Sequence, residues 1–170
     1  MMDEEQGEEA NLPLFPYRFR YAGFALIILG FGAAYLYFFG GRPAFFEVPV
    51  LAIVTSYVET RWFVAAQTNS LDEISFLFFL CGLLFIGFSR DKNENHITNL
   101  IRIKMLFYSV YLTSLIWGLA YITVYGWPII VVSAFIFATF LIVYIILSRL
   151  SLAMYYKNLN VPVIKNSGEL

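Results

Sequence analysis

Apolar residues are gathered into four long runs along the chain, separated by shorter polar or glycine- and proline-containing stretches. Residues 21–39 hold no charged side chain. At about 1.5 Å per helical residue this run covers roughly 28 Å, close to the thickness of one hydrocarbon core. The runs 71–89, 105–124 and 128–147 have the same character, apart from an acidic pair at the start of 71–89. The pattern predicts four transmembrane helices.

The stretch 44–69 is less uniform than these runs. Its first half is apolar around Glu47 and Pro49, and its second half carries Glu59 and Arg61 among aromatic residues of the interfacial type. A crossing helix here would draw charged side chains toward the apolar slab, at about 3 kcal/mol each. We therefore favour an interfacial or re-entrant helical segment at 44–69, with a fifth crossing as the alternative.

The basic residues help to choose between four and five crossings, because cytoplasmic loops of membrane proteins are enriched in lysine and arginine. With four spans, nine of the eleven basic residues lie on the side that holds both termini and the 89–104 loop. A fifth crossing would place the pair Arg18 and Arg20 on the opposite side from that loop. The charges favour four spans, with both termini cytoplasmic and 44–69 external.

Composition supports the same fold class. Hydrophobic residues make up 60% and charged residues 14% of the 170-residue chain, whereas soluble domains carry about 25% charged residues. We expect an all-α integral membrane helical bundle, with four transmembrane helices plus one interfacial or re-entrant helical segment. The helical domain is expected at 13–157, after a disordered acidic tail at 1–12 and before a short cytoplasmic tail at 158–170.

The sequence shows no catalytic motif. His96 is the only histidine, which excludes the paired histidines of common zinc sites and the paired Glu-x-x-His motifs of di-iron bundles. A Gly-rich phosphate loop and a G-x-S-x-G motif are both absent. We expect no enzyme activity, no cofactor and no metal. Nucleic-acid binding has no support either, because no basic patch is interleaved with aromatics.

One group of ionisable residues is a candidate polar or ion site on the predicted external side. It comprises Glu47, Glu59, Asp72 and Glu73, together with Arg61. Ionisable groups at membrane depth tend to be functional. The alternative is structural, since Asp72 and Glu73 would favour the positive end of a helix dipole and Glu59 and Arg61 would form a surface pair. Glu47 is least easily explained this way, because apolar residues flank it on both sides.

Within the predicted spans, Gly30 and Ala34 form a small-xxx-small pair that indicates close packing against a second helix. Apart from Asp72 and Glu73, the four spans carry no charged side chain. This pattern argues against a voltage sensor and against a proton pump with buried carboxylates.

The segments between the spans are distinctive. They read FFEVPV at 45–50, SYVETR at 56–61, TNSLDEI at 68–74, GFSRDK at 87–92 and IRIK at 101–104. In these segments the chain resembles a family of small uncharacterised bacterial multi-pass membrane proteins of about this length. That family has no assigned activity. The resemblance implies a bacterial cytoplasmic (inner) membrane location and carries over no catalytic residue.

Two functional hypotheses follow. The first is a multi-pass integral membrane protein that acts in the lipid bilayer as an accessory, scaffolding or sensing component, through a second copy of itself or another membrane protein. The alternative is a small transporter or channel subunit that uses the external acidic cluster, with Glu47 at its entrance. The sequence leaves the substrate, the partner and the oligomeric state open.

Overall fold

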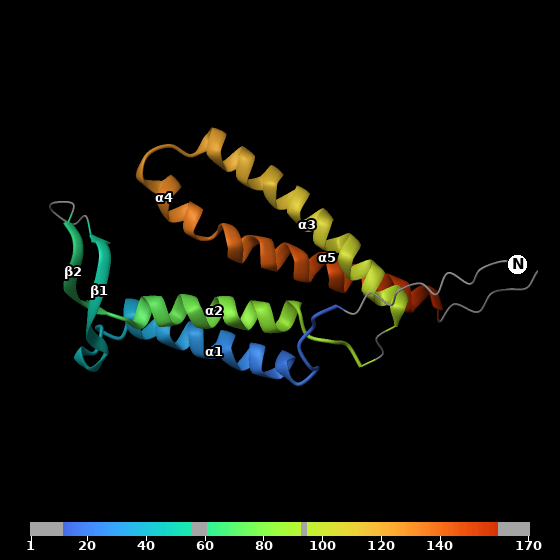
Figure 1. Cartoon of the computed structure of the whole chain (residues 1–170), viewed down its shortest axis with the longest axis horizontal. Coiled ribbons are helices and arrows are strands. Elements are labelled where there is room, and N and C mark those ends of the chain that lie inside the picture. The colour runs from blue at the N-terminus through green and yellow to red at the C-terminus, as the bar shows by residue number, and fades with distance from the viewer. Residues whose placement is uncertain (1–11, 56–60, 93–94, 160–170) are drawn as a thin grey trace, which may run out of the picture. The chain divides into compact units, whose positions relative to one another are not determined.

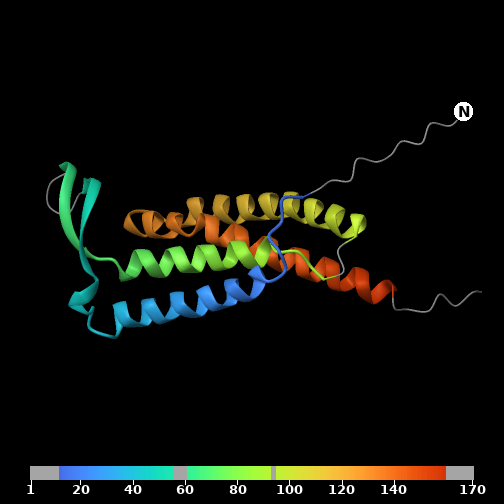
Figure 2. The same ribbon diagram turned by 60° about the horizontal axis from the view of Figure 1, so that its bottom comes forward.

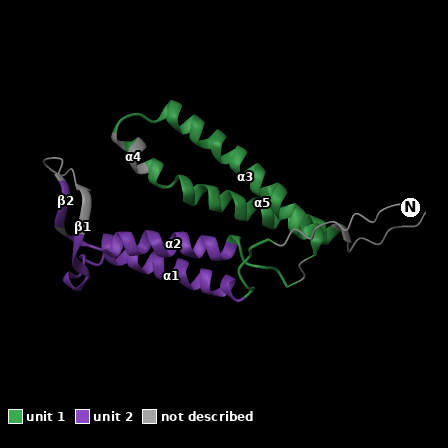
Figure 3. Ribbon diagram, viewed as in Figure 1, with its two compact units in different colours: residues 1–17, 87–170 green, residues 18–86 purple. Residues whose placement is uncertain are grey.

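The computed structural model describes residues 12–55, 61–92 and 95–159, and the described part of the chain is mostly helical (Figure 1). The predicted tail at 1–12, apart from Leu12, lies outside the described residues, and so does 160–170, most of the predicted C-terminal tail. The chain divides into two compact units (Figure 3). We call residues 18–86, purple in that figure, the first unit, and residues 1–17 and 87–170, green in that figure, the second unit.

In the first unit, helices α1 (Phe19–Phe38) and α2 (Leu71–Gly87) lie side by side and antiparallel (Figure 2). A Cβ added at Gly23 would stand 2.8 Å from the carbonyl oxygen of Gly82, and one added at Gly82 would stand 2.8 Å from that of Gly23. The two backbones approach this closely because neither residue has a side chain. These glycines therefore set the distance between the helices.

A second close contact lies two turns away along both helices. The Ser75 hydroxyl donates a hydrogen bond to the carbonyl oxygen of Gly30 at 2.8 Å, and a Cβ at Gly30 would meet the Ser75 carbonyl oxygen at 3.1 Å. Gly30 thus lies in a helix contact, as the small-xxx-small pair indicates, while Ala34 is half-buried. The repeat of seven residues on each helix, from Gly23 to Gly30 and from Ser75 to Gly82, keeps small residues on the shared face.

The expectation of a helical segment at 44–69 is wrong. After one short 3₁₀ turn, Ala44–Phe46, the chain forms an antiparallel hairpin of β1 (Glu47–Thr55) and β2 (Arg61–Asn69), in which Glu47 pairs with Asn69 and Thr55 with Arg61. The expected all-α class is corrected by this small sheet.

The local sequence explains why the hairpin forms. The run Val48-Pro49-Val50 and the later Ile53-Val54-Thr55 are rich in β-branched residues, which favour strands. Pro49 would remove a hydrogen bond from a helix interior, whereas a two-stranded sheet leaves each strand one outer edge where proline is tolerated. The strand-forming residues of 44–69, and not its apolar character, therefore decide its structure.

In the second unit, helix α3 (His96–Thr123) packs against α5 (Ile136–Leu159), and the short helix α4 (Trp127–Ala134) precedes α5. α3 begins nine residues before the predicted span at 105–124, because Asn95 and Thr98 form a capping box at its first turn. The predicted span at 128–147 is divided at Phe135, and α5 continues to Leu159. The helical run at this end of the chain is therefore longer than its apolar core.

The two faces of α3 have inverted polarity compared with a helix of a soluble protein. Its buried residues all carry a polar atom, and they are Thr98, Arg102, Ser109, Thr113 and Trp117. Its exposed residues include many large apolar side chains, such as Phe107, Leu115, Leu119 and Ile122. A helix with this distribution is suited to a lipid environment, where the outer surface needs no polar groups.

Three described helices are long and apolar enough to cross a membrane: α1, α3 and residues Ile136–Lys157 of α5. The predicted span at 71–89 corresponds to α2, which has 17 residues and covers about 25 Å. α2 is not among the three, so the fourth crossing stays a prediction.

Replacing Gly82 by alanine should weaken the α1–α2 contact, because the new Cβ would lie 2.6 Å from Cγ1 of Ile27 and 2.8 Å from the Gly23 carbonyl oxygen. We expect a loss of about 1–3 kcal/mol of stability, seen as a lower melting temperature of the purified protein in mild detergent. The matched control is Gly32→Ala in α1, where an added Cβ has no neighbour within 4 Å. Equal melting temperatures for the two variants would contradict this account of the helix contact.

Candidate functional site: an ion cluster at the basic end of the α3–α5 pair

Charged side chains of the second unit are confined to one end of the α3–α5 pair. Between Met105 and Ser148 the sequence holds none. The described residues of this unit outside that interval include one acidic residue, Asp91, and six basic residues: Arg90, Lys92, Arg102, Lys104, Arg149 and Lys157. We call this region the basic end.

Asp91 is the centre of the basic end, because its two carboxylate oxygens accept from two different arginines. Nη2 of Arg102 lies 2.7 Å from Oδ2, and Nη1 of Arg149 lies 3.1 Å from Oδ1. Nη1 of Arg102 also donates to the carbonyl oxygen of Ser89 at 3.1 Å. The Asp91 carboxylate thus joins the loop after α2 to both helices of the pair.

Burial differs sharply between the two arginines. The side chain of Arg102 is 4% exposed, that of Asp91 is 16% exposed and that of Arg149 is 37% exposed. A guanidinium as buried as that of Arg102 needs ion and hydrogen-bond partners, and Asp91 and Ser89 supply two of them. Arg149 instead lies at the rim, with part of its surface open to the surroundings.

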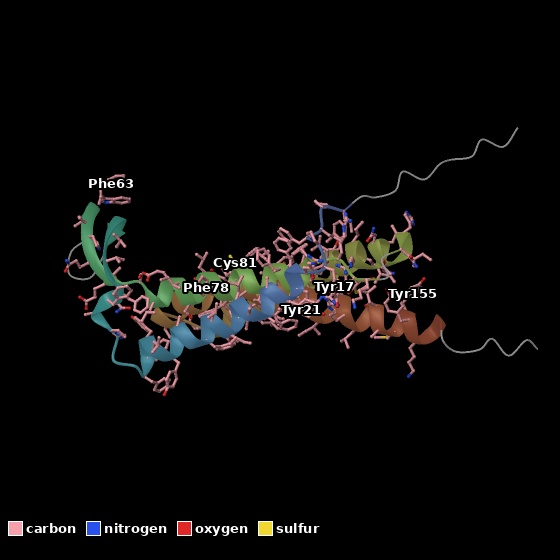
Figure 4. The ribbon with its side chains drawn as sticks, turned by 90° about the horizontal axis from the view of Figure 1, so that it is seen from below. Tyr17, Tyr21, Phe63, Phe78, Cys81 and Tyr155 are labelled. Atoms are coloured by element: carbon pink, nitrogen blue, oxygen red, sulfur yellow. The ribbon has the colours of Figure 1, made fainter. Side chains whose placement is uncertain are left out.

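Backbone hydrogen bonds hold the loop that carries Asp91. Phe15 donates its backbone N–H to the carbonyl oxygen of Phe88 at 2.9 Å, and Arg90 donates to that of Phe15 at 2.8 Å. The ring of Phe88 stacks on Tyr144 of α5 at 5.0 Å. Nζ of Lys92 lies 5.3 Å from the centre of the Tyr17 ring, which Figure 4 labels. The lead-in before α1 therefore belongs to the same local structure as the ion cluster.

The other polar residues of the α3–α5 pair differ in how their hydrogen-bonding groups are satisfied. The hydroxyls of Ser109 and Ser148 donate to backbone carbonyls of their own helices, at 2.7 and 3.1 Å, and that of Ser151 contacts Sδ of Met105 at 3.0 Å. Within the described part of the chain, Oγ1 of Thr113 and Nε1 of Trp117 have no hydrogen-bond partner, and both residues are 7% exposed. These two groups leave hydrogen-bonding capacity inside the pair.

The predicted external cluster is only partly brought together. In the strand register Glu47 is opposite Asn69, at the base of the hairpin. Asn69 precedes Asp72 and Glu73, which lie in the first turn of α2, by only a few residues. Arg61 pairs with Thr55 at the other end, eight residues along β1 and hence roughly 26 Å away. Glu59 lies outside the described residues. The carboxylates of Glu47, Asp72 and Glu73 are exposed. Among the described residues, no group of three or more acidic, histidine or cysteine side chains is arranged to hold a metal ion.

The base of the hairpin is itself well ordered by hydrogen bonds. The Asn69 side-chain amide donates to the Pro43 carbonyl oxygen at 3.2 Å, and its oxygen accepts from the backbone N–H of Leu71. The Ser70 backbone N–H donates to the Phe46 carbonyl oxygen at 3.0 Å. These bonds fix the start of α2, where Asp72 and Glu73 favour the positive end of the helix dipole.

Sequence reasoning missed the ion cluster. Asp91 and Arg149 are 58 residues apart, and in sequence Asp91 looks like one charge of a solvated loop. The sequence does hold one signal: Arg102 lies at helical spacing from Thr98, Ser109 and Thr113, so these polar residues are expected on one face of a helix.

Removing the charge of Asp91 should destabilise the second unit, because Arg102 would remain buried without its anionic partner. We expect Asp91→Asn to lose about 3 kcal/mol of stability, measured as a lower unfolding temperature in detergent. The matched control is Glu47→Gln, which removes an exposed carboxylate and should change stability by less than about 0.5 kcal/mol. Equal unfolding temperatures for Asp91→Asn and Glu47→Gln would show that the ion cluster does not stabilise the unit.

Comparison with other proteins adds no outside support for a function. The chain matches no family model, no curated protein and no solved structure.

Proposed function

We propose that this protein is a multi-pass membrane protein with four crossings, formed by α1, α2, α3 and α5. Three of these helices have the required length and apolar character. Support for α2 as the fourth is its close packing along α1 and its lack of charge after Glu73. A bilayer can thin locally around a helix that is short for the hydrocarbon core.

The orientation follows from the basic residues. An even number of crossings places the N-terminal lead-in, the segment 89–104 and the C-terminal end of the chain on one side, and these segments carry nine of the eleven lysine and arginine residues. We propose that this side is the cytoplasm and that the hairpin is outside. The resemblance noted from the sequence supports the bacterial inner membrane as the location.

We further propose that the protein has no catalytic site of its own and acts through partners, as an accessory, scaffolding or sensing component. The observation that carries this is the hairpin. Trp62 and Phe63 on β2 are 66% and 70% exposed, and the Phe63 side chain is labelled in Figure 4. In this two-stranded sheet each strand also has an outer edge without a neighbouring described strand. Exposed aromatics and open strand edges are features that partner proteins bind.

The backbone at Phe63 supports the same assignment. Its φ of 53° is in the left-handed region, which is unfavourable for a bulky aromatic residue. Strain of this kind tends to be retained where it serves a function. In the hairpin it places a large apolar ring on an exposed position.

The alternative, a transporter or channel subunit using the external acidic cluster, has less support. Glu47, Asp72 and Glu73 come from the same end of the hairpin, but Arg61 lies at the opposite end. The inner faces of α3 and α5 carry charge only at the basic end.

The partner-binding proposal predicts a stoichiometric companion of the chain. Gentle extraction of the tagged full-length protein, followed by native mass spectrometry, should give a complex heavier than the 19.5 kDa single chain, either a homo-oligomer or a complex with a second membrane protein. Trp62→Ala together with Phe63→Ala should remove the companion by deleting the exposed aromatics. The matched control is Leu115→Ala on the exposed face of α3, which should retain it.

A single uncomplexed chain in several mild detergents would contradict the partner-binding proposal. So would a companion that binds the hairpin variant and the Leu115→Ala control equally well.

A further inference from the structure

The hairpin is a sheet of two strands, and this makes it the least self-sufficient element of the first unit. β1 and β2 pair with each other, and no third strand of the described chain joins them. An isolated two-stranded hairpin is only marginally stable in water, and three or more strands are needed for independent stability. A further strand along one edge of the hairpin would therefore stabilise it.

The outer edge of β1 is closed by a proline. Pro49 lies opposite Gln67 of β2, and proline has no N–H to donate. Opposed residues of an antiparallel sheet alternate between pairs that exchange hydrogen bonds and pairs whose backbone groups point away from each other. A proline fits only the second kind of pair, so the missing donor of Pro49 is missing from the outer edge of β1. Proline at such a position protects an edge against further pairing.

The outer edge of β2 has no such protection. Residues 64–69 include neither proline nor lysine, which are the residues that commonly block an edge. By the same alternation, Ala65 and Gln67 direct their backbone N–H and C=O groups outward, where the described chain places no strand. The left-handed backbone at Phe63 ends the regular part of this edge. We call residues 64–69 the open edge.

Two copies of the chain in one membrane would present their open edges to each other in the antiparallel direction. Within the first unit, the hairpin lies across the ends of α1 and α2 (Figures 1 and 2). In the topology proposed above, its strands therefore run along the membrane surface. Copies in one membrane share their orientation, so a two-fold axis between them is perpendicular to that surface. Such an axis makes two strands that run along the surface antiparallel.

We propose that β2 pairs along the open edge with β2 of a second copy, with Ala66 at the two-fold axis and Ala65 of each copy opposite Gln67 of the other. The product is a four-stranded sheet in the order β1-β2-β2-β1. Pro49 lies on both of its outer edges, so the assembly closes as a dimer and does not extend. The inference rests on the partner-binding function proposed above, and it names the partner as a second copy of the chain.

Cysteine crosslinking tests this register in membranes that hold the full-length chain. In the Cys81→Ser background, Ala66→Cys places two cysteines in a pair whose Cα atoms are about 4.5 Å apart, a separation that a disulfide spans. With copper phenanthroline as the oxidant, we expect most of the chain to migrate at twice the 19.5 kDa of one copy. The matched control is Val50→Cys, the register partner of Ala66 on β1, which should remain monomeric.

A pair of proline variants tests the open edge without cysteines. Gln67→Pro removes an outward donor from β2, and the dimer loses it twice, once from each copy. We expect dimerisation to become at least about tenfold weaker, measured by native mass spectrometry over a concentration series in mild detergent. Leu51→Pro removes an outward donor from β1 instead, because Leu51 is opposite Ala65, and it should leave dimerisation unchanged.

Absence of the Ala66→Cys crosslink, or equal crosslinking of Ala66→Cys and Val50→Cys, would overturn the proposal. Equal dimerisation of the two proline variants would do the same, and the crosslink decides alone if either of them fails to fold. A heavier complex that holds only one copy of this chain would overturn the inference and retain the partner-binding function. A single uncomplexed chain would contradict both.

Discussion

A guanidinium group that is almost fully buried has to be given an anion, and the second unit is organised around that requirement. Arg102 projects from the inner face of α3, and the only described acidic residue of the unit, Asp91, is its ion partner. The same carboxylate binds Arg149, so one side chain connects the loop after α2 with α3 and α5. In a medium of low polarity this ion pair stabilises the fold against its own loss, because a charged side chain left there without its partner would be strongly destabilising.

The remaining features of the unit are consistent with this constraint. Phe15 holds the loop by backbone hydrogen bonds on both sides of Ser89, and Phe88 anchors it on Tyr144. Between Met105 and Ser148 the helices carry no charge, and their hydroxyls bond mainly to their own backbone. Polar chemistry is thus concentrated where the helices end, and the apolar outer faces are left for lipid. The first unit reaches close packing differently, through Gly23, Gly30 and Gly82.

How much of this could be predicted depends on the range of the interactions. The helices follow from local hydrophobic runs, and their positions agree with α1, α2 and α3 to within a few residues at most ends. The hairpin was missed because hydropathy does not separate a strand from an interfacial helix, although the β-branched residues around Pro49 and at 53–55 favoured strands. The helical spacing of Ile97, Leu100 and Ile101 predicts that α3 starts ahead of its apolar run, and the cap at Asn95 sets its first residue.

The candidate sites show the same division. Asp72 and Glu73 were correctly placed at the start of a helix, because that is a local matter. The distance between Glu47 and Arg61 depends on strand register, and the ion cluster depends on the antiparallel packing of α3 and α5; neither can be read from spacing along the chain. Buried polar residues at helical spacing on α3 were the one local indication of where to look.

The central claim is that α2 returns the chain across the membrane, so that the hairpin and the basic end face opposite sides. Cysteine accessibility tests this directly, in a background in which the single native cysteine is replaced, Cys81→Ser. One cysteine is introduced at Phe45, which is 88% exposed, and in a second variant at His96, which is exposed at the start of α3. A membrane-impermeant maleimide added to intact cells should label position 45, and should label position 96 only after permeabilisation. Labelling of both positions from the same side would contradict the account.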